Sequence, residues 1–207
     1  NGAGKSTLIK VLSGIHKRDG GTIELFGKPV EFANIAESQK AGISVIHQEL
    51  NMMNHLTVAQ NIYIGREPMK GIMIDDRKMV RSAGELFRHI GVNIDPEIML
   101  GTLTVGKQQM VEIAKAISHD CKLLVLDEPT AALDPIAEAE IYEKFNEITG
   151  DKTAIYISHR LSSCKFCDKI VVFHEGSVIQ TGTHQELAAD KNGKYFQLWT
   201  AQAQYYR

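Results

Sequence analysis

The stretch Gly2-Ala3-Gly4-Lys5-Ser6-Thr7 stands near the start of the sequence and leads directly into apolar residues at helical spacing from Leu8 onward. Glycines let backbone N–H groups turn inward around phosphate oxygens, and the following helix adds the positive end of its dipole. Lys5 can reach the outer phosphates of a nucleotide, and the Ser6 hydroxyl suits Mg²⁺. The stretch therefore predicts the back half of a phosphate-binding loop. Taken alone, it also fits a glycine turn that caps a helix.

Apolar runs bounded by turn residues predict the strands. Residues 123–126 are apolar on both faces and lead into Asp127 and Glu128, a pattern typical of a central parallel strand. Further strands are expected at residues 22–26, 43–46 and 153–158, and a hairpin at 169–174 and 178–181.

Capping residues followed by apolar residues at helical spacing predict the helices. Strands that alternate with helices indicate an α/β fold with a mostly parallel sheet, and residues 48–118 look like a helical insert. The expected helices begin after Thr57, Asp75, Gly106, Asp134 and Thr183.

Composition narrows the possible classes of function. Lys and Arg number 23 against 25 Asp and Glu, so the net charge of -2 gives no bulk attraction to nucleic acid or to an anionic membrane. No apolar run approaches the roughly 18 residues that a membrane-spanning helix needs. The sequence shows neither an initiator Met nor a secretory leader, and its three cysteines fit a reducing compartment. Cytosol is the expected compartment.

Asp127 and Glu128 are carboxylates, which phosphoryl transfer requires in addition to groups that position the phosphates. One carboxylate can hold Mg²⁺ through water, and the other can orient an attacking water molecule. The backbone at a strand's end can turn both side chains toward one site. The alternative is a pair of solvated acidic residues, which the fully apolar run before them disfavours.

Leu103-Thr104-Val105-Gly106-Lys107 stands about twenty residues before Asp127 and completes a larger pattern. With the loop at Lys5 and with Gln48, Asp127-Glu128, Asp134 and Ser158-His159-Arg160, it resembles the ATP-binding cassette (ABC) ATPases in order and spacing. The resemblance implies a P-loop NTPase fold with a mostly parallel central sheet and a helical subdomain at about residues 48–118. It implies that residues 1–207 form one ATP-binding domain that is truncated at its N-terminus, because the first glycine of the loop would lie before Asn1.

The same resemblance implies a division of roles. Two cassettes would pair head to tail around two ATP molecules, so each nucleotide would meet the loop of one copy and the segment at Thr104 of the other. Catalytic roles then fall to Glu128, His159 and Gln48, and Mg²⁺ binding to Ser6, Gln48 and Asp127. The expected nucleotide-binding residues are Asn1, Gly2, Ala3, Gly4, Lys5, Ser6, Thr7, Thr104, Val105, Gly106, Lys107 and Asp134.

This sequence departs from the family's commonest signature, which has Ser, Gly and Gln where Thr104, Val105 and Lys107 stand. Threonine keeps the hydroxyl donor, and Lys107 adds a positive charge that suits phosphate. Thr104 and Gly106 also fit a plain helix cap, and capping explains Asp134 equally well.

The chain resembles two subfamilies. Residues 47–50, 65–68 and 103–118 look like the cassettes of bacterial monosaccharide importers, whereas residues 158–163, 168–172 and 182–187 look like exporters in which cassette and membrane domain are fused. The change falls near residues 126–133, which leads to the hypothesis that two parts have been joined.

The preferred function is ATP hydrolysis that drives sugar import through separate membrane permease subunits, with the cassette on the cytoplasmic face of the membrane and no nucleic-acid partner. The alternatives are a nucleotide-binding module without turnover, because the phosphate loop is incomplete, and an exporter cassette for peptide, lipid or drug.

Overall fold

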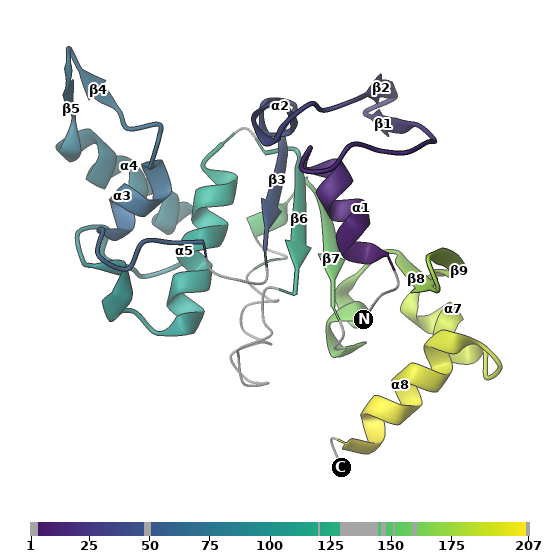
Figure 1. Ribbon diagram of the computed structural model, residues 1–207. Helices are drawn as coiled ribbons and strands as arrows, with labels where there is room; N and C mark the ends of the chain where they lie inside the picture. Colours follow the sequence, from purple (N-terminus) through teal and green to yellow (C-terminus); the bar gives the residue numbers. More distant parts are fainter. Residues whose placement is uncertain are drawn as a thin grey trace. The chain divides into compact units, whose positions relative to one another are not determined.

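The computed structural model describes residues 4–47, 51–119, 121–128, 145, 148–150, 152–158 and 161–205. The chain divides into two compact units. Unit 1 consists of Asn1–Glu37 and Ile157–Arg207, and unit 2 of Ser38–Tyr156. In Figure 1 the purple and yellow-green parts of the ribbon belong to unit 1, and the blue and teal parts to unit 2.

A sheet ordered β3–β6–β7 forms the framework of unit 2, with β6 in the middle (Figure 1). Strands β3 (Ile43–Ile46) and β6 (Leu123–Asp127) pair in parallel, with Ile43 opposite Leu123 and Ile46 opposite Leu126. Strand β7 is Thr153–Ile157. The side chains of β6 are buried up to Leu126, which confirms the central parallel strand expected from the sequence.

Two helices of unit 2 begin where the sequence predicts, after Thr57 and Asp75, whereas the helix expected after Gly106 begins two residues earlier, at Val105. The Thr57 side chain and Gln60 form a capping box at the start of α3, and Asp75 accepts a hydrogen bond from the backbone N–H of Lys78 at the start of α4. Their buried faces and the β6 side chains share one core, which includes Phe87, Val111 and Leu124. The helices are α3 (Val58–Tyr63), α4 (Asp76–His89), the short 3₁₀ helix η1 (Leu100–Thr102) and α5 (Val105–Ile117).

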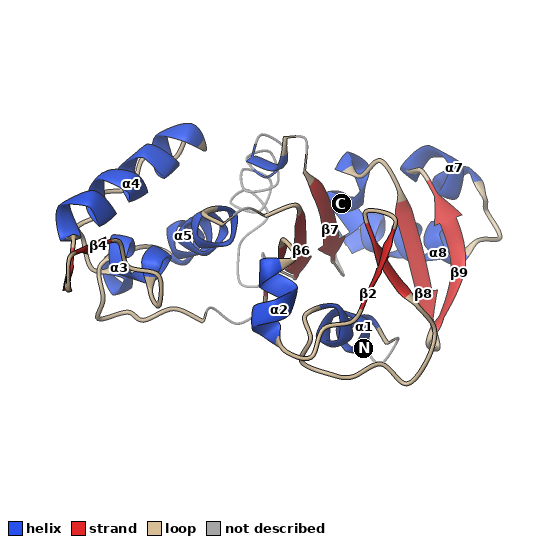
Figure 2. Ribbon diagram, turned by 90° about the horizontal axis from the view of Figure 1, so that it is seen from above, coloured by secondary structure: helices blue, strands red, loops and turns tan. Residues whose placement is uncertain are grey.

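Unit 1 contains helix α1 (Lys5–Leu12), two hairpins and a helical C-terminal part. The predicted C-terminal hairpin is confirmed as β8 (Ile170–His174) and β9 (Ser177–Gly182), drawn in red in Figure 2. Thr183 caps α7 (His184–Ala189) through a capping box with Glu186, as expected. The 3₁₀ helix η2 (Leu161–Phe166) and α8 (Lys194–Tyr205) complete the unit, whose small core includes Leu161, Val172 and Tyr195.

The strand expected at residues 22–26 is confirmed, whereas its hairpin partner, a short helix and a second small hairpin were not predicted from the sequence. Strand β1 (Ile23–Leu25) pairs with β2 (Lys28–Val30) across Phe26 and Gly27, which both have positive φ. Helix α2 spans Ile35–Lys40, and β4 (Met69–Lys70) forms a second small hairpin with β5 (Met73–Ile74). The start of the helix predicted after Asp134 lies outside the described residues, whereas Phe145, Ile148 and Thr149 near its expected end are helical.

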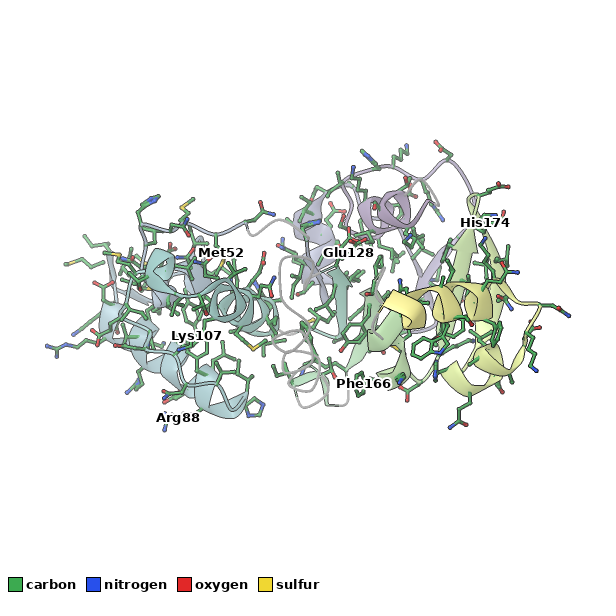
Figure 3. All side chains as sticks on the ribbon, turned by 90° about the horizontal axis from the view of Figure 1, so that it is seen from below. Met52, Arg88, Lys107, Glu128, Phe166 and His174 are labelled. Atoms are coloured by element: carbon green, nitrogen blue, oxygen red, sulfur yellow. The ribbon has the colours of Figure 1, made fainter. Side chains whose placement is uncertain are left out.

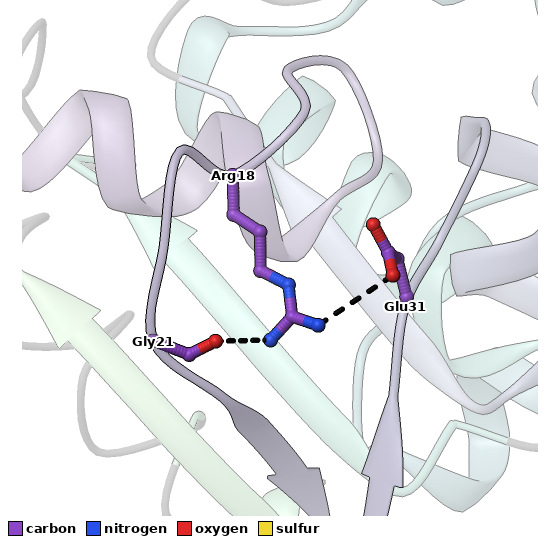
Figure 4. Close-up of polar contacts among 3 residues, drawn as sticks. All are labelled: Arg18, Gly21 and Glu31. Atoms are coloured by element: carbon purple, nitrogen blue, oxygen red, sulfur yellow. Dashed lines mark hydrogen bonds and ion pairs between the residues drawn. The ribbon is translucent and has the colours of Figure 1, made fainter.

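Arg18 holds the loop that leads from α1 into the first hairpin (Figure 4). Its guanidinium donates a hydrogen bond of 2.6 Å to the carbonyl oxygen of Gly21 and lies 3.5 Å from the Glu31 carboxylate. The Glu31 side chain is 55% exposed, so this ion pair contributes little, about 0–1 kcal/mol, to stability. The bond to the Gly21 carbonyl fixes the loop geometry instead.

Asn61 of α3 is a buried polar side chain that organises the preceding turn of unit 2. Its Oδ1 accepts a hydrogen bond of 2.8 Å from the backbone N–H of Met53, and its Nδ2 donates to the carbonyl oxygens of Met53 at 2.9 Å and Thr57 at 3.0 Å. One amide side chain therefore supplies the acceptor for the Met53 N–H and adds hydrogen bonds to two carbonyl oxygens of this turn.

We predict that Asn61→Leu lowers the free energy of unfolding by about 2–4 kcal/mol, because it removes these hydrogen bonds and takes away the acceptor of the Met53 N–H. Asn54→Ala, at an exposed position in the same turn, should change it by less than about 0.5 kcal/mol. Urea unfolding followed by circular dichroism measures both values. Equal small effects of the two substitutions would contradict the structural role of Asn61.

Candidate functional site

The predicted phosphate loop leads into α1 in unit 1. Gly4 precedes the helix with φ 87° and ψ -4°, a left-handed conformation that glycine adopts without strain. Within the part of the chain that the structure describes, no side chain caps this helix, and its first turn contains no acidic residue that would offset the positive end of the helix dipole. Lys5 is half-buried, while Ser6 and Thr7 are exposed. This arrangement presents backbone N–H groups, a cation and two hydroxyl groups at a helix N-terminus, which is suited to an anion.

Asp127 and Glu128 lie at the end of β6 in unit 2, and both are half-buried. Glu128, labelled in Figure 3, has φ 50°. A left-handed backbone strains a residue that has a Cβ atom, and such residues cluster at functional sites. Strand β6 ends at Asp127, and the unusual backbone of Glu128 turns the chain away from the strand direction. The carboxylates therefore lie where a buried strand leaves the core.

The signature-like segment forms the start of α5. Thr104 is the N-cap residue, with φ -63° and ψ 155°, but its hydroxyl makes no capping hydrogen bond. Thr104 and Lys107 are exposed, Val105 is 43% exposed, and Lys107 is labelled in Figure 3. The turn before the helix is held by Gln108, whose Nε2 donates to the carbonyl oxygen of Leu103 at 3.0 Å. A second helix N-terminus therefore exposes a hydroxyl that does not serve as a cap.

The predicted site residues are divided between the units. Gly4, Lys5, Ser6 and Thr7 belong to unit 1, whereas the segment from Thr104 to Lys107 belongs to unit 2 with Asp127 and Glu128. Asp127 and Glu128 are neighbours at one strand end. The expected site residues Asn1, Gly2, Ala3, Gln48, Asp134 and His159 lie outside the described residues.

Sequence reasoning missed a buried carboxyl group in α5. Glu112 is 9% exposed, and burial raises its pKa to about 7, although the backbone N–H of Asn51 and the charge of Lys115 favour the ionised form. The sequence does carry a signal for it, because Glu112 stands between Val111 and Ile113 in the middle of the helix. Both neighbours are buried, so α5 is enclosed on more than one side here.

Positively charged groups lie around the C-terminal half of α5. The Arg66 guanidinium donates to the Ser118 hydroxyl at 3.0 Å and to the carbonyl oxygen of Ile62 at 2.9 Å. Burial lowers the pKa of Lys115. Burial also lowers the pKa of His119, and the positive charges of Arg66 and Lys115 lower it further. Neutral His119 is therefore favoured beside two cations.

Within the described ranges, no helix is both long and apolar enough to cross a membrane. Among the same residues, no three His, Cys, Asp or Glu side chains are grouped so that they could share a metal ion.

Comparison with known proteins identifies the family. The family model described as "ABC transporter" matches residues 1–131. The chain belongs to the ABC transporter family. The sequence is 46% identical over 185 residues to a putative ribose/galactose/methyl galactoside import ATP-binding protein 2 of Burkholderia cenocepacia (strain HI2424), covering 87% of this chain and 36% of that protein. It is 47% identical over 198 residues to the ribose import ATP-binding protein RbsA of Geobacillus kaustophilus (strain HTA426), and this alignment covers 92% of this chain and 40% of that protein.

The chain thus spans well under half the length of these relatives. The resemblance to monosaccharide importer cassettes is confirmed. The hypothesis of two joined parts stays a prediction, because an alignment over 92% of the chain averages the identity across both parts.

Solved structures confirm the P-loop NTPase fold. MJ1267, an ATP-binding cassette of an ABC transporter, aligns with a TM-score of 0.80 at 26% identity and covers 95% of this chain and 83% of that one. A bacterial Atm1-family ABC exporter with ATP bound aligns with a TM-score of 0.75 at 27% identity, and the alignment covers 97% of this chain and 35% of that one. The same cassette architecture is therefore found in an exporter.

We predict that Glu128→Gly is more stable than Glu128→Ala by about 1 kcal/mol, because both remove the side chain but only glycine relieves the left-handed backbone. The same pair of substitutions at Glu175, which has φ 48° in an exposed turn, should give a similar difference. Thermal unfolding of all four variants measures the difference in stability between glycine and alanine at each position. A more stable alanine variant at position 128 would show that Glu128 is not strained.

We predict that Glu112 makes stability depend on pH. Its folded pKa of about 7 lies above the ordinary value of 4.5, so the folded state binds a proton more tightly than the unfolded state. This stabilisation is complete below pH 4.5 and is lost as the pH rises through 7. From pH 5 to pH 8 the wild type should lose about 2.5 kcal/mol more than Glu112→Gln. Urea unfolding of both proteins at several pH values tests this, and a constant difference between them would contradict it.

Proposed function

We propose that the chain is the ATP-binding and ATP-hydrolysing cassette of an importer for a monosaccharide of the ribose or galactose type. The observation that carries this proposal is its 42–48% identity to import ATP-binding proteins for ribose, galactose and methyl galactoside. Residues 1–207 would act as one ATP-binding domain, with a helical subdomain at about residues 48–118.

The loop before α1 would hold the phosphates of ATP. Asn1, Gly2 and Ala3 would complete the loop, Lys5 would contact the outer phosphates, and the backbone N–H groups of the first turn would face the phosphate oxygens. The exposed Ser6 and Thr7 and the absence of an acidic residue in that turn support this role.

The end of β6 would supply the groups for hydrolysis. Glu128 would orient the attacking water and draw its proton, as a carboxylate on a strained, fixed backbone can do. The Asp127 carboxylate and the Ser6 hydroxyl are hard oxygen donors of the kind Mg²⁺ prefers, so the donor set fits this ion. When bound, Mg²⁺ supplies charge that offsets the negative charge on the phosphate oxygens. Gln48 would join this set, and His159 would contact the terminal phosphate.

A second copy of the cassette would complete the nucleotide site. The exposed start of α5 supports this role, because the Thr104 hydroxyl makes no capping bond and Lys107 adds a charge. The hydroxyl, the N–H of Gly106 and Lys107 of one copy would meet the phosphates held by the other. Val105 would line this surface and Asp134 would lie at the same pairing surface.

Membrane permease subunits would carry the sugar, with the cassette bound to their cytoplasmic face. The relatives are import ATP-binding proteins by name, and the described helices offer no membrane span. An exporter cassette is the alternative suggested by the C-terminal third, but the matched relatives favour import.

We predict Mg²⁺-dependent ATP hydrolysis that Glu128→Gln lowers by about a hundredfold or more, because the water loses its base and its orientation. ATP binding should stay within about threefold of the wild type, since Glu128 contributes to turnover rather than to affinity. Steady-state phosphate release and ATP titration, each with and without EDTA, measure the two quantities. Glu85→Gln, an exposed position on α4, is the matched control.

ATP binding without hydrolysis by the wild type, with membrane subunits supplied, would identify a nucleotide-binding module instead. Replacing the aligned segment of the Geobacillus kaustophilus ribose import protein with this chain then tests import. Uptake of labelled ribose should continue, and it should stop when Glu128→Gln is added.

A further inference from the structure

Helix α8, at the yellow end of the ribbon in Figure 1, supplies a hydrogen-bond acceptor to the start of η2. The side-chain Oε1 of Gln202 accepts a hydrogen bond of 2.8 Å from the backbone N–H of Leu161, the first residue of η2. The two residues stand 41 positions apart in the sequence. This bond therefore ties the second half of the C-terminal helix to the segment that follows β7.

The sequence before η2 explains why this acceptor comes from a distant helix. The first N–H groups of a helix have no partner within it, and a side chain just before the helix usually accepts a hydrogen bond from one of them. Arg160 stands at that position, and a guanidinium has donors only. Gln202 supplies the acceptor that the residue type at position 160 does not offer.

Gln202 belongs to a face of α8 that packs on η2. Tyr195, Trp199 and Gln202 stand at i, i+4 and i+7, which places them on one side of a helix. Tyr195 and Leu161 are buried in one apolar core, and Trp199 packs against it. The ammonium nitrogen of Lys165 in η2 lies 5.0 Å from the centre of the Trp199 ring. The hydrogen bond from Leu161 is thus part of a packed contact between the two helices.

The start of α8 is fixed to two other elements of unit 1. The backbone N–H of Tyr195 donates to the Oε1 of Gln180 in β9 at 2.9 Å. The Tyr195 hydroxyl and the Nδ1 of His184 in α7 share a hydrogen bond of 2.7 Å. Because α8 is anchored in this way at its N-terminal end, Gln202 holds the Leu161 backbone against a fixed support.

We propose that Gln202 is a positioning residue for ATP hydrolysis: by fixing the backbone of Leu161 it restricts the position of His159, two residues earlier. The inference rests on the proposed function, in which His159 contacts the terminal phosphate. Only residues 158–160 connect the end of β7 to Leu161, so a displaced Leu161 changes the positions that His159 can reach. ATP affinity, which depends on the loop before α1, is retained.

The test compares Gln202→Met, which removes the acceptor at similar volume, with Gln202→Glu, which keeps an acceptor oxygen at the same distance along the side chain. Gln202→Met should lower kcat about fivefold, leave KM for ATP within about twofold and speed amide hydrogen exchange at Leu161 about fivefold, the size expected for one neutral hydrogen bond. Gln202→Glu should stay within about twofold of the wild type in all three measurements. If Gln202→Met changes neither kcat nor exchange, the inference is wrong.

A double-mutant cycle separates the positioning of His159 from a general loss of stability. His159→Ala should lower kcat, and adding Gln202→Met should then change the remaining rate by less than about twofold, because the group that Gln202 positions is already absent. An equal loss in both backgrounds would show that Gln202 acts by another route and would overturn the inference. Full activity of His159→Ala would overturn it as well, because Gln202 would have no catalytic group to position.

Gln197→Met is the matched control, because Gln197 is an exposed glutamine of the same helix. It should leave kcat and exchange at Leu161 unchanged, and a loss equal to that of Gln202→Met would contradict the inference. If Gln202→Met does not fold, Gln202→Ala also removes the acceptor, favours the helix and should show the same loss of kcat. A wild type that does not hydrolyse ATP would count against the proposed function, whereas an active wild type with an unaffected Gln202→Met would refute this inference alone.

Discussion

Strand β6 lies between β3 and β7, and from Leu123 to Leu126 its side chains are buried. In the buried centre of a sheet every backbone N–H and carbonyl group requires a hydrogen-bond partner, so the strand cannot shift without breaking hydrogen bonds to both neighbouring strands. This constraint determines where Asp127 and Glu128 emerge. Because the strand is fixed, the strained backbone of Glu128 can be maintained, and the carboxylates have a defined position before any ligand binds.

Five helices in the described part of the chain differ in how their N-termini are capped. Helices α3, α4 and α7 begin with side-chain caps from Thr57, Asp75 and Thr183, so part of their N-terminal backbone is satisfied within the protein. Helices α1 and α5 begin without a side-chain cap and have no acidic residue in the first turn. The backbone N–H groups and the dipole at such a helix N-terminus are suited to an external anion. Among these five helices, the two that carry the sequence motifs are thus the ones without a side-chain cap.

Most elements of the fold could be predicted because their signals are local. A cap followed by apolar residues located α3, α4 and α7, and an apolar run located β6. The missed elements lack such signals. Strand β2 contains Pro29, which argues against a strand, and its turn requires a left-handed Phe26. Strands β4 and β5 are too short to show alternation. The hydrogen bonds between Asn34 and Glu37 that support the start of α2 depend on side-chain geometry.

In the candidate site, too, only the residues with a local sequence signal could be predicted. The loop at Lys5, the segment at Thr104 and the strand end at Asp127 were identified because their residue types follow one another in the sequence. Glu112 was not identified, because it belongs to no motif of residue types. Its neighbours on both sides are apolar, so helical periodicity assigns it to neither a buried nor an exposed face. Only the packed structure shows that the carboxyl group is buried, and this burial is what raises its pKa to about 7 and makes the residue matter for stability at different pH values.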